Sequence, residues 1–230
     1  MNSLMQEINR ILTPDNLAFM LKGAGMALVL AGGALLIGVV LGVFGAMGRI
    51  SRHGFPRWIA TIYVEAIRGT PMLLQVTFLF LAVPSIYRSV TGMQFKPDPF
   101  IVGLLAMGIN SGAYTTELIR SGIEGIDRGQ MEAARSLGLS HGFSMRYVIL
   151  PQAFKRIIPP LVSEFIVLIK DSALLSSIGV LELMQRARAL NNQYYNPVVP
   201  LCAAAIMYLA MTLTVSFIAR RLERRMKVSD

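Results

Sequence analysis

Residues 132–151 read EAARSLGLSHGFSMRYVILP, a polar stretch that lies between apolar segments. Asp127, with Gln130 three positions later, predicts a helix start, because an N-cap carboxylate accepts hydrogen bonds from first-turn amides and the glutamine can bond back. Gly138 stands where a helix would end in a left-handed residue, and Ser140 can cap a second helix. The stretch therefore predicts a short, rigid helix–glycine–helix unit at a membrane surface, where another protein docks.

The composition indicates an all-α, polytopic membrane protein. Hydrophobic residues make up 54% of the chain, charged residues 15%, and the mean hydropathy is +0.56. A soluble domain of this size carries about a quarter charged residues. Residues 24–48 form 25 consecutive uncharged positions, more than the roughly 20 that span a bilayer. This segment is too long for a signal-peptide core, so we interpret it as the first membrane span.

The apolar segments predict about five transmembrane helices in one transmembrane domain, residues 20–225. An amphipathic segment, residues 1–19, precedes them with Ile8, Ile11 and Leu12 on one face, and is expected at the outer interface. A loop over residues 127–151 is expected in the cytoplasm, and residues 226–230 end a basic tail. The predicted spans are 20–48, 58–85, 100–121, 156–176 and 198–219.

Two features of these spans carry further expectations. Gly38 and Gly42 are spaced for close helix contact, either in general packing with neighbouring spans or in a dimer seam. Pro159 and Pro160 predict a fourth span that is bent or begins late. Residues 177–197 are too polar to span the membrane and are expected at the outer face.

The distribution of the cations predicts the orientation. The net charge is +9, which by itself is compatible with nucleic-acid binding. With the N-terminus outside, however, the inner segments hold 14 Lys and Arg residues and the outer segments hold seven. This bias fits the positive-inside rule and argues against a nucleic-acid partner. It places the C-terminus and the 127–151 loop in the cytoplasm.

Ionisable groups within the spans are candidate solute ligands, because charges at membrane depth are costly and are usually functional or paired. Arg68 lies near mid-bilayer in the second span, and Glu65 is on the same helix face. They form either a structural ion pair or part of a polar cavity in which Arg68 binds a carboxylate. Gly69 and Pro71 can unwind the helix beside such a cavity, where Thr70 adds a hydroxyl.

Two other spans supply polar groups at similar depth. Asn110 lies midway along the third span. Glu164 and Asp171 are seven residues apart, on one face of the fourth span. Asp171 either pairs with the adjacent Lys170 or, with Ser172 beside it, binds the ammonium of an amino acid. A cation on one wall and carboxylates on another suit a zwitterion.

No enzymatic or metal chemistry is indicated. The chain has no G-x-x-x-x-G-K-[ST] phosphate loop, so no ATP hydrolysis and no cofactor of its own are expected. His53 and His141 lack partners at ligand spacing, and the single cysteine, Cys202, is interpreted as a small packing residue. Glu117 and Arg120 are interpreted as a helical pair that stabilises the entry into the polar loop.

Several motifs, in order, resemble the permease subunits of ABC importers, specifically the polar-amino-acid branch. The EAA loop of that family reads EAA, three residues, Gly, nine residues, Ile, any residue, Leu-Pro, and here Val148 replaces the Ile. The chain also reads KDSAL where many members read KDTSL. The resemblance covers about residues 17–225. The other matching motifs are EAIRGTP at 65–71, AYTTELIRSGIEGIDRGQ at 113–130, LPQAF at 150–154 and KDSALLSSIG at 170–179.

The resemblance implies a type I importer (MetI-like) fold in a bacterial cytoplasmic (inner) membrane, in contact with lipid. It implies a second permease subunit (the same or a different chain), two ABC ATPase subunits that bind the ATP, and an extracytoplasmic solute-binding protein. The EAA residues expected to couple to the ATPase are Glu132, Ala133, Ala134 and Gly138. The residues expected to contact a polar amino acid are Glu65, Arg68, Thr70, Asn110, Glu164, Asp171 and Ser172.

Two other functions are compatible with the residues. A gradient-driven secondary transporter would use Glu65, Arg68 and Asp171 as a relay, and would take up solute with no ATPase present. A membrane scaffold without transport would tolerate Arg68→Ala and Asp171→Ala with no change in solute uptake.

Overall fold

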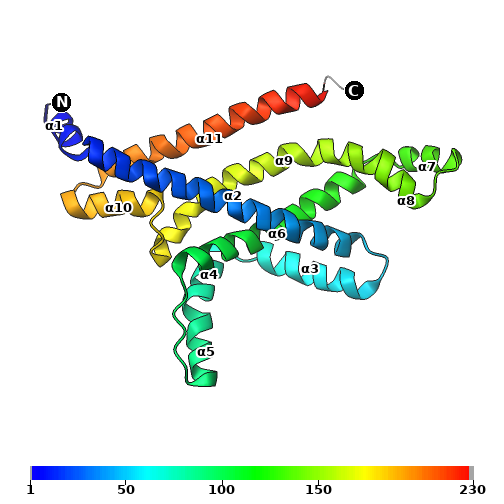
Figure 1. The fold of residues 1–230 in the computed structure, drawn as a ribbon, viewed down its shortest axis with the longest axis horizontal. Helices are drawn as coiled ribbons and strands as arrows, with labels where there is room; N and C mark the ends of the chain where they lie inside the picture. The colour runs from blue at the N-terminus through cyan, green and yellow to red at the C-terminus, as the bar shows by residue number, and fades with distance from the viewer. Residues whose placement is uncertain (1, 228–230) are drawn as a thin grey trace.

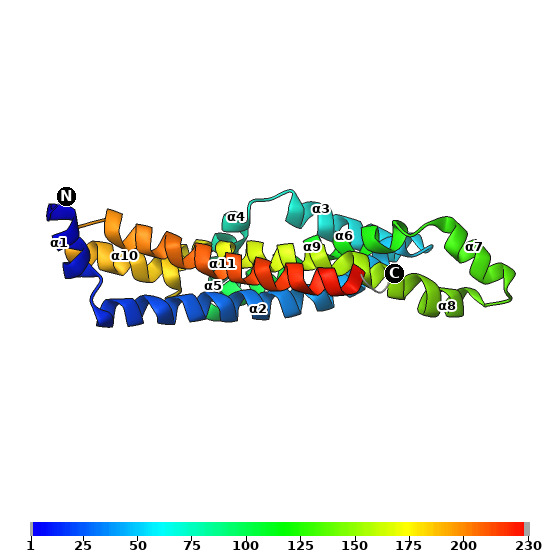
Figure 2. The same ribbon diagram turned by 90° about the horizontal axis from the view of Figure 1, so that it is seen from above.

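The computed structural model describes the backbone of residues 2–227 and the side chains of residues 5–221. Within these residues the secondary structure is helical, with no strand, as predicted. The long helices run along one axis, with α1 and α10 at one end and α7 and α8 at the other (Figures 1 and 2). Residues 228–230 of the predicted basic tail lie outside the described part of the chain.

The first span is longer than predicted. After α1 (Asn2–Ile11), α2 runs over Pro14–Ile50, which is about 55 Å of helix. Thr13 caps it by accepting a hydrogen bond from the Asn16 amide at 3.3 Å, and a proline at the first helical position is favourable because its missing N–H is not needed there.

The second span is not one helix. The chain forms α3 (Gly54–Arg68), breaks at residues 69–71, and resumes as α4 (Met72–Thr77), the π-helical turn η1 (Phe78–Ala82) and α5 (Val83–Thr91). The unwinding expected from Gly69 and Pro71 is thus confirmed. The part after the break turns away from the bundle axis (Figure 1).

Three further helices complete the bundle: α6 (Pro99–Glu124), α9 (Leu150–Asp171) and α11 (Val198–Lys227). Of the two expectations for the fourth span, the late start is wrong, because α9 continues through Pro159 and Pro160 and directly follows the π-helical turn η2 (Met145–Ile149). The bend stays a prediction. Proline has a helical φ, so its cost is chiefly a lost hydrogen bond, which packing in a bundle can offset.

Three stretches of the described chain are both long and apolar enough to cross a membrane: Pro14–Ile50, Met72–Thr91 and Val198–Arg221. Helices α6 and α9 have 26 and 22 residues, lengths of about 39 and 33 Å. They are therefore long enough to span, and their lower hydropathy reflects the polar side chains discussed below.

Close contact between α2 and α6 forms the centre of the bundle. A Cβ atom at Gly38 would lie 2.6 Å from Ser111 Oγ, and one at Gly42 would lie 2.5 Å from Thr115 Cγ2. Only glycine permits this separation. The spaced pair thus packs within the chain, as the general-packing interpretation expected.

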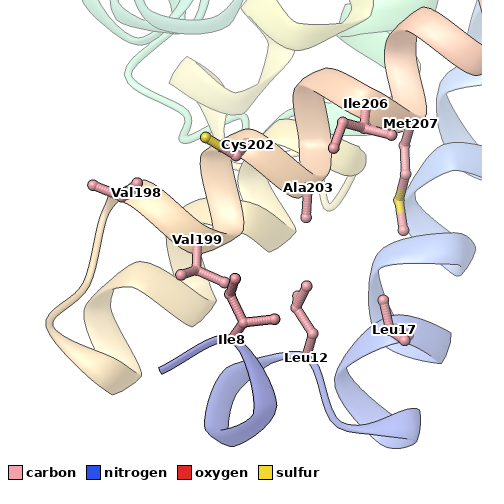
Figure 3. Close-up of a pocket in the computed structure, with 9 residues that line it drawn as sticks. All are labelled: Ile8, Leu12, Leu17, Val198, Val199, Cys202, Ala203, Ile206 and Met207. Carbon is pink, nitrogen blue, oxygen red and sulfur yellow. The ribbon is translucent and has the colours of Figure 1, made fainter. Parts of the chain in front are cut away.

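The bundle is closed at the other end by short elements. The 3₁₀ helix η3 (Ser172–Ile178) leads to α10 (Leu183–Tyr194), which is too short to span a membrane, as expected for this polar segment. The apolar face of α1 packs here: Ile11 is fully buried. Figure 3 shows Ile8 and Leu12 facing the first turns of α11 across an apolar pocket of about 360 Å³.

Candidate functional site

A cavity of about 550 Å³ lies where the break between α3 and α4 faces α6 and α9. Polar and apolar groups share its wall. The cavity brings together five of the seven predicted solute-contact residues. Its lining residues are Arg68, Gly69, Thr70, Pro71, Met72, Asn110, Tyr114, Glu164, Val167 and Asp171.

The break is held open by a side chain that the sequence analysis missed. Gln75 donates from Nε2 to the Ile67 carbonyl at 2.8 Å and to Thr70 Oγ1 at 2.8 Å. Its Oε1 accepts a hydrogen bond from Asn110 Nδ2 at 2.9 Å. Gln75 thus satisfies backbone and hydroxyl groups at the break and ties them to α6. The sequence feature that could have indicated this role is the position of Gln75, a lone amide in a mostly apolar run after the RGTP motif.

Arg68 lies at the last position of α3 and lines the cavity. Its guanidinium carbon is 5.2 Å from the ring centroid of Tyr114, a cation–π arrangement. Among the described side chains, no carboxylate lies within ion-pair distance of Arg68. The cation is therefore free to bind an anionic group in the cavity.

The predicted structural pair between Glu65 and Arg68 is wrong. Glu65 is 69% exposed and lies 3.8 Å from Arg49, at the end of α2. The reason is tertiary: α2 brings Arg49 close to Glu65, whereas Arg68 lies against Tyr114. Glu65 does not line the cavity, and its contact with solute stays a prediction.

Glu164 and Asp171 are half-buried and both line the cavity, as their shared helix face predicted. The alternative Lys170–Asp171 salt bridge is wrong: Lys170 is exposed, and no ion pair joins the two among the described side chains. Adjacent residues on a helix point in different directions. The cavity thus contains two carboxylates that have no cation within ion-pair distance among the side chains of residues 5–221.

Ser172 does not line the cavity. It is fully buried, and its hydroxyl donates to the Ile169 carbonyl at 2.8 Å. The residue begins η3, where the helix tightens after Asp171. Its position supports the turn beneath Asp171, and direct contact with solute stays a prediction.

The EAA loop forms the predicted helix–glycine–helix unit. It consists of α7 (Arg128–Ser136) and α8 (His141–Ser144). Asp127 caps α7 by accepting from the Gly129 amide at 2.8 Å, and Ser140 caps α8 by accepting from Phe143 at 3.4 Å. Gly138 has φ +84°, the left-handed conformation that glycine adopts without the steric cost of a Cβ atom.

One detail of the predicted cap differs. Gln130 does not bond back to Asp127 to complete a capping box. Its Oε1 instead accepts from Gln152 Nε2 at 3.2 Å, and the guanidinium of Arg156 donates to the Gly125 carbonyl. These contacts join the unit to the start of α9, because α9 returns beside the loop in the folded chain.

The helix–glycine–helix unit of α7 and α8, named the docking unit below for its predicted role, lies at the end of the molecule remote from α1 and α10 (Figure 2). Glu132, Ala133 and Gly138 are exposed, whereas Ala134 is buried and packs inside the unit. Sequence analysis missed the large apolar side chains of this surface. They are Leu137, Phe143 and Tyr147, and the two rings stack with centroids 5.8 Å apart.

An ionic cluster joins the bundle to this end. Glu117 contacts Arg49 at 3.1 Å and Arg120 at 2.7 Å, and Arg120 also contacts Glu124 at 2.5 Å. The predicted Glu117–Arg120 pair is confirmed and is part of a larger cluster. It links α2 to α6 close to the helix end from which the docking unit emerges.

Residues 38–228 match the family described as binding-protein-dependent transport system inner membrane component. Among curated relatives, the arginine transport system permease protein ArtQ of Bacillus subtilis is 36% identical over 95% of this chain and 97% of its own. The glutamine transport system permease protein GlnP of Escherichia coli K12 is 37% identical, over 91% and 93%.

Solved structures of ABC transporters are similar to this chain over most of its length. An amino acid ABC transporter crystallised with histidines contains a chain 40% identical to this one, with a TM-score of 0.84 and coverage of 90% and 94%. The methionine ABC transporter MetNI, at 17% identity and a TM-score of 0.77 over 93% and 99%, shows the same fold and confirms the MetI-like prediction. This chain therefore belongs to the family of inner-membrane components of binding-protein-dependent transport systems.

Proposed function

We propose that the chain is the permease subunit of an ATP-driven importer that moves a polar amino acid into the cytoplasm. The observation that carries the proposal is the cavity, in which a free guanidinium from one helix faces two carboxylates from another. Few solutes other than a zwitterion need both charges at membrane depth. The names of the relatives support the same class of solute.

Each charged group in the cavity has a role in binding. Arg68 offers a planar fork to the α-carboxylate of the solute. Glu164 and Asp171 accept from its α-ammonium and from other donors. The backbone at the break, with Thr70 and Asn110 in the cavity lining, offers polar groups that replace water around the solute. Unwound backbone is expected where a membrane protein lines such a site.

The docking unit couples this site to ATP hydrolysis by another subunit. We propose that α7 and α8 seat in a cleft of an ABC ATPase subunit, which binds and hydrolyses the ATP. The exposed Glu132 makes polar contacts there, and Leu137, Phe143 and Tyr147 supply apolar area. Because Gly138 and both caps keep the unit rigid, movement of the ATPase is transmitted to α6 and α9, which line the cavity.

The remaining partners follow from the architecture. The Met72–Thr91 segment is apolar and largely uncovered, and we propose that a second permease subunit and lipid cover it. A solute-binding protein delivers the amino acid at the end formed by α1 and α10, which we place outside the bacterial cytoplasmic membrane. The docking unit and the C-terminus then lie in the cytoplasm.

Reconstitution tests the proposal against a gradient-driven transporter and a scaffold. The complete assembly is placed in vesicles with ATP, and uptake of labelled amino acids is measured with and without the ATPase subunit. We expect uptake that requires ATP hydrolysis and is lost in Arg68→Ala. Uptake driven by an ion gradient without the ATPase, or unaltered uptake in Arg68→Ala, would refute the proposal.

A further inference from the structure

We infer that the amino acid bound in this cavity has a cationic side chain. The inference rests on the proposed function and narrows its substrate class. It comes from the charges that line the cavity. These charges do not sum to zero when the carboxylate and ammonium common to all amino acids are bound.

The charge balance is set by three side chains. Arg68 contributes one positive charge, and Glu164 and Asp171 contribute two negative charges, so the lining carries a net charge of −1 in its ionised form. The nearby charges do not alter this balance. Glu65 is exposed and close to Arg49, and Lys170 is exposed and outside the lining.

A bound zwitterion satisfies one charge of each sign. Its carboxylate pairs with Arg68, its ammonium pairs with one carboxylate, and the other carboxylate is left without a cation. A neutral side chain would leave that charge uncompensated in a half-buried site, and an acidic side chain would add a second negative charge. Both arrangements are unfavourable away from bulk water. A cationic side chain brings the total to zero.

The spacing of the carboxylates fits two separate cations. Glu164 and Asp171 lie seven residues apart on α9, about 10 Å along the helix axis. An extended basic amino acid has two cationic ends, separated by its aliphatic chain, and Met72 and Val167 provide apolar surface in the same lining.

The test measures binding to the permease itself. The intact permease–ATPase assembly is placed in nanodiscs without the solute-binding protein, and equilibrium binding of labelled arginine, glutamine and glutamate is compared. We expect arginine to bind at least about tenfold more tightly than glutamine, the effect of one hydrogen-bonded charge, and glutamate to bind most weakly.

Matched variants identify the cause. Glu164→Gln and Asp171→Asn each bring the lining to zero net charge, so each should bring the arginine-to-glutamine preference to one or below. A monodisperse assembly on gel filtration shows that each variant is folded. Glu124→Gln makes the same chemical change at the docking-unit end of α6, where Glu124 contacts Arg120, and should keep the preference for arginine.

Two results are informative in different ways. If glutamine or glutamate binds as tightly as arginine in the natural protein, or if both cavity variants keep the preference, the charge argument is overturned and amino-acid import still stands. If no amino acid binds and none enters the vesicles described above, the proposed function itself fails, and this inference fails with it.

Discussion

Replacing Gln75 by leucine should disable the cavity while leaving the bundle folded. The side chain satisfies the Ile67 carbonyl, Thr70 Oγ1 and Asn110 Nδ2 with bonds of 2.8 to 2.9 Å. Leucine has nearly the same volume but leaves these groups without that partner. A buried polar group left unsatisfied costs about 1–3 kcal/mol, and here partial exposure to water reduces the sum.

We therefore expect Gln75→Leu to destabilise the break by about 1–3 kcal/mol, which corresponds to roughly 5- to 150-fold in population of the competent cavity. The assay is ATP-dependent uptake in vesicles, together with binding of the amino acid to the permease in nanodiscs. Both should fall by similar factors, because the lost interaction shapes the site before transport begins.

Two further variants distinguish the hydrogen bonds that Gln75 donates from the one that it accepts from Asn110. Gln75→Glu keeps an acceptor for Asn110 but removes the donor to Ile67 and Thr70, so it should be nearly as damaging as leucine. Asn110→Ala combined with Gln75→Leu should cost less than the sum of the single changes, because the residues share one bond. Gln193→Leu, at an exposed position on α10, is the control that makes the same chemical change away from the cavity.

Normal binding and uptake in Gln75→Leu would refute the role of Gln75 in shaping the cavity. Strict additivity with Asn110→Ala would refute the proposed link between α4 and α6. Loss of folded protein in detergent, with equal loss in Gln193→Leu, would show that substitution of any glutamine by leucine is harmful and would also count against the specific role.

Three other changes test separate parts of the structure. Gly138→Ala must place a Cβ at φ +84°, a cost of about 1–2 kcal/mol. ATP hydrolysis should continue while uptake falls, and uptake at the level of the natural protein would contradict the role of Gly138 in transmitting movement of the ATPase. Gly42→Leu drives a side chain into Thr115 and should cost at least about 1–3 kcal/mol, seen as loss of monodisperse protein on gel filtration, whereas the same change at Gly25, which faces open space, should be tolerated. Arg49→Ala removes the 3.1 Å contact with Glu117 and should lower the free energy of unfolding by about 1–2 kcal/mol, seen as a lower thermal midpoint, with partial recovery in Arg49→Lys. An unchanged midpoint would show that the ionic cluster does not stabilise the bundle.

Much of this protein follows from local rules. The helices and the docking unit depend on hydropathy, cap residues and the φ preference of glycine, which act within a few residues of chain. The break at residues 69–71 could likewise be predicted from the sequence, because proline lacks an N–H and glycine weakens a helix wherever they occur.

The partners of the charged side chains could not be obtained in this way. Glu65 and Arg68 share a helix face, yet one lies near Arg49 and the other against Tyr114. Lys170 and Asp171 are neighbours in sequence, yet only Asp171 lines the cavity. Gln75 carried little signal of its own, because its role depends on Asn110, a residue of another helix.

The amino-acid sequence by itself determined that the chain is a helical membrane protein with a broken second span and a helix–glycine–helix loop. Only the tertiary structure decided which polar groups meet in one cavity and which pair elsewhere. The physical reason is that helix formation depends on contacts within a turn or two, whereas the meeting of α3, α4, α6 and α9 depends on how whole helices tilt and rotate against one another.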